Sequence, residues 1–333
     1  MIITSISLTN FRNHETYHLD CNPDTTLILG ANGCGKTSVL EAIYILTRGK
    51  SFRATDVDIL KRGTDFYRIE LEYDNGGTIT ATFDGAKKTF ITTAKKSTRL
   101  PKKNKYPIVL FLPSDLNLIS GSPSRHRDYF DRIFSQISEE YAENLTKYEK
   151  TLRQRNELLK TPNITQSALF SWNLLLAKYG VKLHRLRADF VSEINFSLGH
   201  IYKTIASNQD EVSLRYHTDV TNATESSYLS ELEYNFTKDL YLGHTSFGVH
   251  RDDFIFYFNQ KPADGSASRG ETRSIILALK FVEANLIYQK LHQKPIILLD
   301  DVFSELDNAR RKCLVDNFKD HQVIITSVEQ INY

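Results

Sequence analysis

Cysteine is scarce in this sequence: 333 residues hold only Cys21, Cys34 and Cys313. The three form neither a C-x-x-C pair nor a zinc-binding pattern, which excludes a disulfide-stapled scaffold and a zinc module. Few cysteines without a pairing pattern are typical of proteins in a reducing compartment, so we expect a cytoplasmic protein.

Long apolar runs are also missing. No run approaches the roughly 20 residues of a membrane-spanning helix. The alternating N-terminus, MIITSISLTNFRNHE, lacks the basic and apolar regions of a secretory signal. We therefore expect no membrane partner.

A strong charge imbalance is absent as well, because 42 Lys and Arg face 40 Asp and Glu, a net charge of +2. That total is too small to indicate nucleic-acid binding by itself. An apolar content of 41% indicates an ordinary globular protein, and the length suits one large or two modest domains.

The most informative stretch that is present matches the phosphate-binding pattern G-x-x-x-x-G-K-[ST]. It follows an apolar run at 26–29 and precedes a helical pattern at 38–46, the strand–loop–helix context that phosphate binding needs. Glycines let backbone N–H groups turn towards phosphate oxygens, and a helix N-terminus adds partial positive charge. We expect ATP to be bound by Gly30, Ala31, Asn32, Gly33, Cys34, Gly35, Lys36 and Thr37.

Three side chains of this loop carry specific predictions. Lys36 would reach the β- and γ-phosphates, and Thr37 would offer its hydroxyl to Mg²⁺. Cys34 lies in the positive field of the loop, which predicts a reactive thiol that bound ATP covers. The alternative is a Cys34 side chain buried beneath the loop.

A second chemical element lies far downstream, where residues 295–301, PIILLDD, predict a buried strand that ends in two carboxylates. P-loop ATPases hold Mg²⁺ with a strand Asp beside the phosphate loop. We expect Asp300 to be the Mg²⁺ ligand, through water, and Asp301 to orient or deprotonate the attacking water. The predicted cofactors are therefore ATP and Mg²⁺.

Two polar segments flank this strand. One precedes a strong helical pattern at 272–288, and the other follows the two carboxylates. Either segment alone is more often a helix cap or a polar turn. In this order they resemble the signature motif and the D-loop of ABC-type ATPases. They consist of Ser268, Arg269, Gly270 and Glu271 in the first and Ser304, Glu305, Leu306 and Asp307 in the second.

The resemblance to ABC-type ATPases implies a composite site. In such a site ATP lies between the phosphate loop of one head and the signature motif of a second head. The signature residues would therefore act on the nucleotide of a partner copy.

Lys36 and Asp300 are 264 positions apart, and the chain between them narrows the class. Residues 124–160 and 165–207 place apolar side chains at helical spacing, but no strict heptad persists over four repeats. We predict an α/β fold, an ABC-type P-loop ATPase head with an inserted compact helical lobe and no coiled-coil arm. The expected parts are residues 1–110 and 246–333 for the ATPase lobe and 111–245 for the helical lobe.

The chain resembles the RecF family of ABC/SMC-like ATPases nearly from end to end. The shared order of the matching segments is specific, although no single one is decisive. They are 8–13 (LTNFRN), 50–53 (KSFR), 111–116 (FLPSDL), 121–131 (GSPSRHRDYFD), 248–253 (GVHRDD), 268–271 (SRGE) and 299–307 (LDDVFSELD). The first segment implies that Arg12 and Asn13 lie next to the nucleotide.

The sequence departs from the family pattern at several positions. Val249 replaces a proline, and His126 stands where another basic residue is more typical. The position of the Q-loop, 114–115, carries no Gln, and the last-strand switch at 323–327 carries no His. The identity of the γ-phosphate sensor is therefore left open, with Thr326 and Ser327 as the candidates.

The family resemblance implies an ATP-dependent homodimer that binds double-stranded and gapped DNA in replication and recombinational repair. The implied partners are the RecR and RecO mediators and the RecA recombinase. Hydrolysis of ATP would be slow and DNA-dependent, with binding and recruitment as the main role.

The alternative functions are those of another SMC- or ABC-like repair head and of a P-loop kinase or nuclease-linked ATPase. The signature motif and D-loop favour the DNA-binding ATPase over a kinase, since kinases need neither motif. The 264-residue spacing argues against the head of a membrane transporter.

Charge placement gives modest physical support for DNA binding. Residues 85–114 contain no Asp or Glu but many lysines. Such a run can neutralise phosphates and make affinity salt-dependent. Lysines also protect an exposed β edge from aggregation, and the sequence leaves these alternatives open. The candidate DNA contacts are Lys87, Lys88, Lys95, Lys96, Arg99, Lys102, Lys103 and Lys105.

The segment 250–253, HRDD, offers a His and two acids, as a metal or nuclease site would need. No second His or acidic group is positioned by the sequence to complete such a site. We therefore expect these side chains to form a paired structural network.

Overall fold

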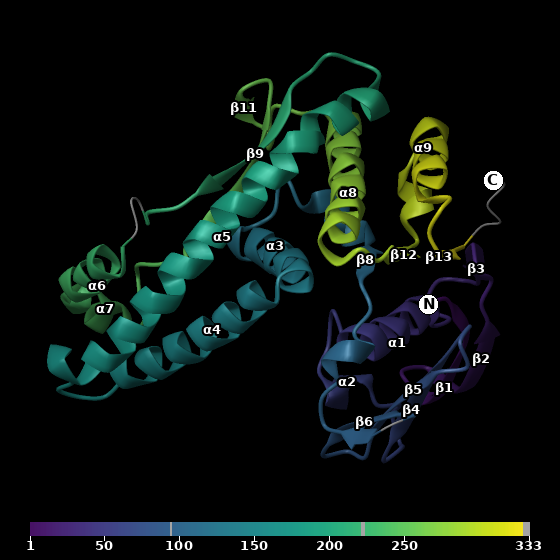
Figure 1. Cartoon of the computed structure of the whole chain (residues 1–333), viewed down its shortest axis with the longest axis horizontal. Helices are drawn as coiled ribbons and strands as arrows, with labels where there is room; N and C mark the ends of the chain where they lie inside the picture. Colours follow the sequence, from purple (N-terminus) through teal and green to yellow (C-terminus); the bar gives the residue numbers. More distant parts are fainter. Residues whose placement is uncertain (94, 221–223, 329–333) are drawn as a thin grey trace. The chain divides into compact units, whose positions relative to one another are not determined.

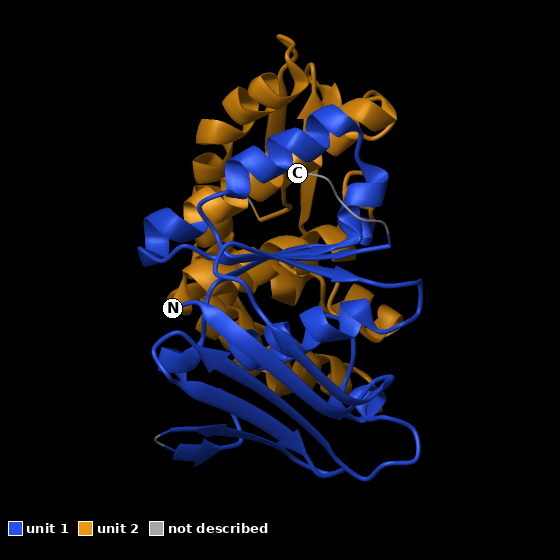
Figure 2. Cartoon of the chain, turned by 90° about the vertical axis from the view of Figure 1, so that its right-hand side faces the viewer, with its two compact units in different colours: residues 1–115, 287–333 blue, residues 116–286 orange. Residues whose placement is uncertain are grey.

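The computed structural model describes residues 1–93, 95–220 and 224–328. Its contacts divide the chain into two compact units, drawn in two colours in Figure 2. Unit 1 holds residues 1–115 and 287–333, and unit 2 holds residues 116–286.

Unit 1 contains a six-stranded antiparallel sheet in the order β2-β1-β4-β5-β6-β7. Buried and exposed side chains alternate along β4, as expected where one face of a sheet covers a core. Strand β7 pairs only with β6 among the described strands, so it forms an edge. The strands are β1 (Ile3–Phe11), β2 (His14–Asp20), β4 (Tyr67–Tyr73), β5 (Thr78–Phe83), β6 (Lys88–Thr92) and β7 (Lys95–Ser97).

The second sheet of unit 1 is parallel and has the order β3-β13-β12-β8. Its strands are β3 (Thr25–Leu29), β8 (Ile108–Phe111), β12 (Ile296–Asp300) and β13 (Val323–Ser327). Strands β8, β12 and β13 are buried at every position, which accounts for their nearly unbroken apolar sequences. Because the four strands run in the same direction, their carboxyl ends meet at one edge of the sheet.

Helix α1 (Lys36–Arg48) packs against strands of both sheets, and almost all of its residues are buried. This position explains why its sequence is apolar on nearly every side rather than in one stripe. Gly49 ends the helix in the left-handed conformation and donates its N–H to the Ile45 carbonyl. Shorter segments are α2 (Asp56–Ile59), α9 (Asn308–Phe318), η1 (Lys102–Asn104), η3 (Val302–Glu305) and, at the boundary of the units, η2 (Pro113–Asn117).

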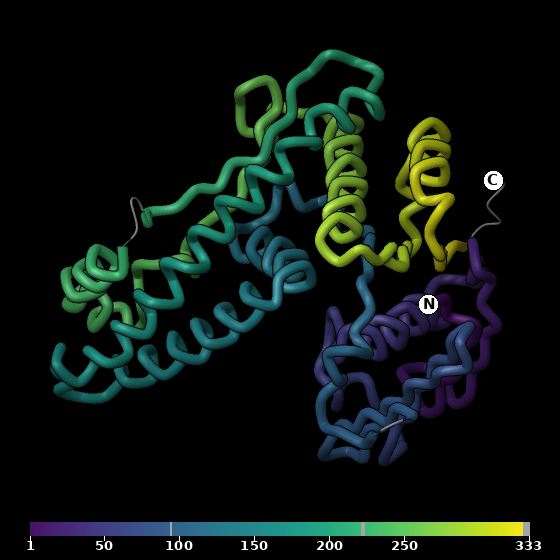
Figure 3. The backbone as a smooth tube through the Cα atoms, viewed as in Figure 1, coloured from purple at the N-terminus to yellow at the C-terminus, as the bar shows by residue number. Residues whose placement is uncertain are grey.

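Unit 2 is built mainly from helices. They are α3 (Pro123–Ile137), α4 (Glu139–Leu159), α5 (Gln166–Ala206), α6 (Glu225–Tyr234), α7 (Phe236–Leu242) and most of α8 (Arg269–Leu291). Helices α4 and α5 lie side by side along much of their length (Figures 1 and 3), which gives a compact lobe. Ser138 separates α3 from α4 and caps α4 by accepting a hydrogen bond from the Tyr141 N–H. In the described part of the chain, no helix has the length and apolarity to cross a membrane.

Unit 2 also contains a three-stranded sheet, β11-β10-β9, that the sequence patterns do not predict. Its strands are β9 (Val212–His217), β10 (Asp253–Phe258) and β11 (Lys261–Pro262). Strand β10 pairs with β9 over its full length and packs on α3 through Phe130 and Phe254. These contacts place residues 246–286 in unit 2, whereas the sequence suggested that they belong with the second part of the ATPase lobe.

Candidate nucleotide-binding site

The phosphate loop lies at the carboxyl edge of the parallel sheet. Strand β3 ends at Leu29, and its neighbour β13 ends opposite it at Ser327. The Gly30 N–H donates to the Ser327 carbonyl at 3.2 Å, which extends the pairing into the loop. Helix α1 begins at Lys36, so the chain passes from strand through loop to a helix N-terminus, as the sequence predicts.

A cavity of about 610 Å³ opens at this loop within unit 1. Its volume falls in the range of small-molecule sites, roughly 300–1,000 Å³. From the predicted set it is lined by Arg12, Asn13, Asn32, Gly33, Gly35, Lys36, Thr37, Asp300 and Asp301. Ser38, Arg53, Ala54 and Asp58 complete the lining and were not predicted. The loop residues Gly30, Ala31 and Cys34 are not part of it.

The loop is held in shape by contacts to its backbone. The Lys36 ammonium donates to the carbonyls of Gly30 at 2.6 Å and Ala31 at 3.1 Å. Asn13 donates from Nδ2 to the Gly33 carbonyl at 3.0 Å. Gly35 has φ +102°, and a Cβ there would overlap the His14 ring, so only glycine fits. The loop carbonyls therefore hold Lys36 in place and leave it facing the cavity.

Asp300 accepts hydrogen bonds from hydroxyl groups on two elements, α1 and β13. The Thr37 hydroxyl donates to its two carboxylate oxygens at 2.8 and 2.9 Å, and the Thr326 hydroxyl donates to Oδ1 at 2.9 Å. The register of the parallel sheet sets Asp300 opposite Thr326. The end of β12 is thereby fixed beside the start of α1.

Asp301 has a different environment, although it is the next residue. Its backbone is left-handed, with φ +49°, and its N–H donates to the Thr326 hydroxyl at 3.0 Å. Its Oδ1 is buried and has no hydrogen-bond partner among the described residues. Burial raises the pKa of the Asp301 carboxyl, Lys36 opposes this shift, and Asp300 adds to it.

These contacts bear on the two candidates for the γ-phosphate sensor, Thr326 and Ser327. Thr326 is fully buried and bonds to Asp300 and Asp301, and neither it nor Ser327 lines the cavity. At the expected Q-loop position, Asp115 is buried and accepts the Leu112 N–H at 3.1 Å. Thr326 thus positions the two acidic residues rather than contacting the cavity.

The cavity also contains an arginine pair. Arg12 and Arg53 both bond to the buried carboxylate of Glu41. The sequence placed Arg12 next to the nucleotide and put Arg53 in a matching segment without a role. It gave no indication of Glu41, because Glu41 lies inside an otherwise apolar helical pattern and its partners are distant in sequence.

Cys34 is exposed, which excludes the alternative of a side chain buried beneath the loop. Its Sγ lies over Gly30, where an added Cβ would meet it at 2.6 Å. The thiol therefore lies at the surface of the loop, against Gly30, although it does not line the cavity.

The signature residues start helix α8 in unit 2. The Ser268 N–H donates to the Glu271 carboxylate at 2.6 Å, and the Glu271 N–H donates to the Ser268 hydroxyl at 3.3 Å. This reciprocal pair is a capping box, which satisfies free N–H groups at the helix start. Ser268 and Arg269 are exposed, and Gly270 and Glu271 are half-buried.

The D-loop residues lie in unit 1, directly after the acidic strand. Ser304 donates to the Asp301 carbonyl at 2.7 Å, and Asp307 caps α9 by accepting the Arg310 N–H at 3.0 Å. Leu306 is buried, whereas Ser304, Glu305 and Asp307 are exposed. The polar side chains of this segment are therefore available at the surface.

The basic segment lies on β6, β7 and the following turn of unit 1. Lys88 is half-buried and donates to Asp56 at 2.8 Å, so part of its charge is compensated. The remaining candidates are exposed: Lys87, Lys95, Lys96, Arg99, Lys102, Lys103 and Lys105. Lys105 is partly covered by its neighbours, and this partial burial together with the nearby Arg48, Lys102 and Lys50 lowers its pKa. Lys95 and Lys96 lie on the edge strand β7. This position suits both contact with DNA phosphates and protection of an exposed β edge from aggregation.

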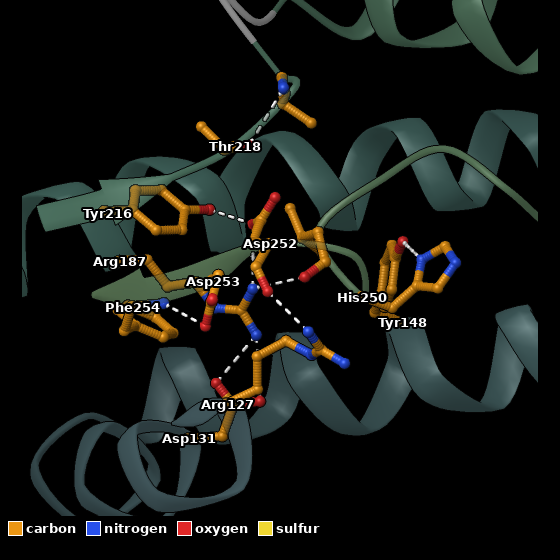
Figure 4. Close-up of polar contacts among 12 residues, drawn as sticks. Arg127, Asp131, Tyr148, Arg187, Tyr216, Thr218, His250, Asp252, Asp253 and Phe254 are labelled. Atoms are coloured by element: carbon orange, nitrogen blue, oxygen red, sulfur yellow. Dashed lines mark hydrogen bonds and ion pairs between the residues drawn. The ribbon is translucent and has the colours of Figure 1, made fainter. Parts of the chain in front are cut away.

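The HRDD segment joins a buried polar network in unit 2 (Figure 4). Arg187 donates to Asp252 at 3.1 Å and to Asp131 at 2.9 Å, and Asp253 bonds to His126 at 2.7 Å. Nε2 of His250 bonds to the Thr245 carbonyl at 3.0 Å. Among the described residues, no group of three or more His, Cys, Asp or Glu could hold a metal ion. The network has the paired character that the sequence suggested.

Comparison with known proteins gives a consistent result. The family model described as the RecF/RecN/SMC N terminal domain matches residues 2–332. A relative from Clostridioides difficile (strain 630) is 33% identical, covering 99% of this chain and 92% of its own length. Another, from Staphylococcus carnosus (strain TM300), is 32% identical, with 100% and 95% covered. Both are named DNA replication and repair protein RecF.

Solved structures agree with the sequence comparison. The structure of the recombination mediator protein RecF-ATP in the RecFOR pathway is 27% identical, with a TM-score of 0.90, and the match covers 100% of this chain and 93% of that one. An Smc head bound to the C-winged helix domain of ScpA shares the fold, with a TM-score of 0.55 and 16% identity. The predicted ABC-type ATPase head fold is therefore confirmed, and the chain belongs to the RecF family of the RecF/RecN/SMC proteins.

Proposed function

We propose that this chain is an ATP-dependent DNA-binding protein of replication and recombinational repair. The observation that carries the nucleotide part is the Thr37–Asp300 hydrogen bond beside Lys36, in a cavity of about 610 Å³. Glycine-rich backbone, a lysine and a hydroxyl at a helix start are the groups that bind a triphosphate chain. The relatives named for DNA replication and repair, and the RecF-ATP structure, support the same role.

The residues present suit a Mg²⁺ ion. The Thr37 hydroxyl and the Asp300 carboxylate are oxygen ligands, which Mg²⁺ prefers, and it is usually bound by one or two carboxylates together with phosphates and water. When bound, Mg²⁺ neutralises charge on the β- and γ-phosphates. Thr37 and Asp300 would hold it, and Thr326 would keep Asp300 in orientation.

Asp301 is the proposed group that orients the attacking water. Its Oδ1 lacks a hydrogen-bond partner among the described residues, so it can accept a proton or a hydrogen bond from a ligand. Its carboxylate lines the cavity, next to Lys36 and Thr37.

Two copies of the chain would enclose ATP between them. The start of α8 at Ser268 is exposed, and a helix dipole favours an anion at the helix N-terminus. Ser304, Glu305 and Asp307 are exposed as well. These segments are suited to contact the nucleotide of the partner copy, which would make dimer formation depend on ATP.

DNA would be held through its backbone by the ATP-bound dimer. The exposed lysines of residues 87–105 support contact with phosphates of double-stranded and gapped DNA. By family resemblance the partners would be RecR, RecO and RecA, and the RecFOR pathway named for the solved relative supports the first two.

Fluorescence anisotropy on labelled gapped and fully duplex DNA tests this function. We expect Mg-ATP to tighten DNA binding by the parent chain and to have no effect on Lys36→Ala, which loses the charge that neutralises phosphate. DNA binding that is equally tight with and without Mg-ATP would contradict the proposal.

A further inference from the structure

Glu41 lies inside α1 and is fully buried, yet it is ionisable. Arg12 donates to it from Nε at 2.9 Å and from a terminal nitrogen at 2.8 Å. Arg53 donates from Nε at 3.1 Å and from a terminal nitrogen at 2.9 Å. The Ser51 hydroxyl adds a bond of 2.6 Å. One carboxylate therefore accepts hydrogen bonds from two guanidinium groups.

Both arginines line the nucleotide cavity, and both come from connecting segments. Arg12 follows β1 with φ +55°, and its N–H and guanidinium also bond to the carbonyls of Ile59 and Asp58. Arg53 lies in the segment that joins α1 to α2. Neither residue lies in a helix or strand. The shared carboxylate orients both side chains, and the Asp58 carbonyl adds one bond to Arg12.

The charges at this part of the cavity wall include a second carboxylate. Two guanidinium groups share the buried carboxylate of Glu41, and Asp58 lines the same cavity near Arg12. Hydrogen bonds from Arg12, Arg53 and Ser51 outweigh burial and lower the pKa of Glu41, which keeps it ionised at neutral pH. The second terminal nitrogen of Arg53 makes no hydrogen bond within the described residues, and the side chain is 39% exposed. A donor is thus left for an anion in the cavity.

We propose that Glu41 is a positioning residue that holds Arg12 and Arg53 ready to bind the phosphate chain of the nucleotide. This inference rests on the proposed ATP site. Long arginine side chains lose rotamer freedom when a ligand orders them, and a carboxylate that orders them beforehand removes this cost from binding. An arginine can serve both partners at once, because its donors point in several directions of one plane.

A purely stabilising role for Glu41 makes a different prediction. In that case the ion pairs would strengthen the fold of unit 1 and leave nucleotide affinity unchanged. The variant Glu41→Gln separates the two roles, because glutamine keeps the size and one acceptor oxygen but presents an NH₂ group to donors. At least one arginine must then turn into solvent, where its attraction for a phosphate is weak.

The experiment measures the dissociation constant of a fluorescent ATP analogue, with competition by unlabelled Mg-ATP, beside a thermal melt of each full-length variant. We expect Glu41→Gln to bind about tenfold more weakly, the scale of one charge-assisted hydrogen bond. Arg53→Gln, whose side chain is partly exposed, is expected to fold normally and lose a similar factor. The double variant should lose little more than either single one, because both act through one contact.

Glu70→Gln is the matched control, since Glu70 pairs with Arg68 on β4 and neither lines the cavity. It should leave ATP affinity unchanged. The inference is overturned if Glu41→Gln binds ATP as tightly as the parent, or if losses from Glu41→Gln and Arg53→Gln simply multiply. Lys36→Ala is measured in parallel: if it also binds like the parent, the proposed ATP site itself fails, which is a distinct outcome.

Discussion

The hydroxyl of Thr37 donates to both carboxylate oxygens of Asp300, at 2.8 and 2.9 Å, across 263 positions of sequence. The contact joins the first turn of α1 to the end of β12. Both ends are fixed independently, the helix by its burial between two sheets and the strand by its pairing with β8 and β13. A hydroxyl and a carboxylate are thereby placed together beside the phosphate loop.

Replacing Asp301 by Asn should separate binding from hydrolysis. An amide keeps the size of the side chain but cannot take a proton from water, so we expect ATP to bind as in the parent while turnover falls, about 10²-fold or more. Single-turnover hydrolysis and nucleotide affinity, measured on the same preparations, check this. Turnover at the parent rate would rule out Asp301 as the group that orients water.

The basic segment is tested by changing Lys95, Lys96, Lys102 and Lys103 to Gln. If these side chains bind phosphates, the logarithmic dependence of duplex affinity on salt flattens by roughly one unit for each DNA phosphate that is no longer neutralised. A charge-matched control changes the exposed Lys178, Lys182, Lys238 and Lys261 of unit 2. Equal slopes for the first variant and the parent, with a flatter slope for the control, would move the DNA surface to unit 2.

Cys34 offers a chemical test of where the nucleotide lies. Its side chain is exposed, whereas burial raises the pKa of Cys21 to about 11 and also raises the pKa of Cys313. A thiol reagent at neutral pH should therefore modify Cys34 first and block ATP binding, and Mg-ATP should protect it. Peptide mapping reads the outcome, and labelling of Cys34 that saturating Mg-ATP leaves unchanged would contradict the placement of the nucleotide.

His250 predicts how stability depends on pH. Its Nε2–H donates to the Thr245 carbonyl. Nδ1 therefore accepts from the Tyr148 hydroxyl at 2.8 Å (Figure 4), so both nitrogens of the neutral ring are bonded. Burial lowers the pKa of His250 from 6.5 to about 4, and the nearby Arg251 and Arg127 favour the same direction. The unfolded chain thus binds the proton first as pH falls.

Stability should consequently decrease between pH 6.5 and about 4, by roughly 3 kcal/mol from this group. The variant His250→Gln should show a flatter dependence of unfolding free energy on pH over that window, whatever its absolute stability. Denaturant unfolding at several pH values measures the slope, with His200→Gln as an exposed control. A variant slope equal to that of the parent would show that His250 is not the responsible group.

The parts of the site that the sequence predicts are those whose chemistry is local. The residues from Gly30 to Thr37 and the strand ending at Asp300 must each be continuous in sequence to form a loop or a strand end. Local sequence patterns do not identify Glu41, because its partners Arg12 and Arg53 come from separate segments and only the fold brings them together.

The fold shows the same limit. Helical periodicity predicts α3, α4 and α5, because one stripe of side chains carries the signal. The sheet of β9 and β10 depends on pairing between residues 212–217 and 253–258, which no local pattern specifies. The role of the basic segment is equally undetermined, since an exposed edge strand favours lysine whether or not DNA binds there.

Joining of two chains by ATP is tested most directly by light scattering on the parent and on Ser268→Arg, each with and without Mg-ATP. Ser268 is exposed at the start of α8, so an arginine fits the monomer but would fill the proposed phosphate contact with the partner copy. Ser192→Arg, an exposed change on α5, controls for added charge. We predict that Mg-ATP doubles the mass of the parent and of Ser192→Arg but not that of Ser268→Arg, which still binds ATP. A doubled mass for Ser268→Arg, or a parent that stays monomeric with saturating Mg-ATP, would contradict the two-chain site.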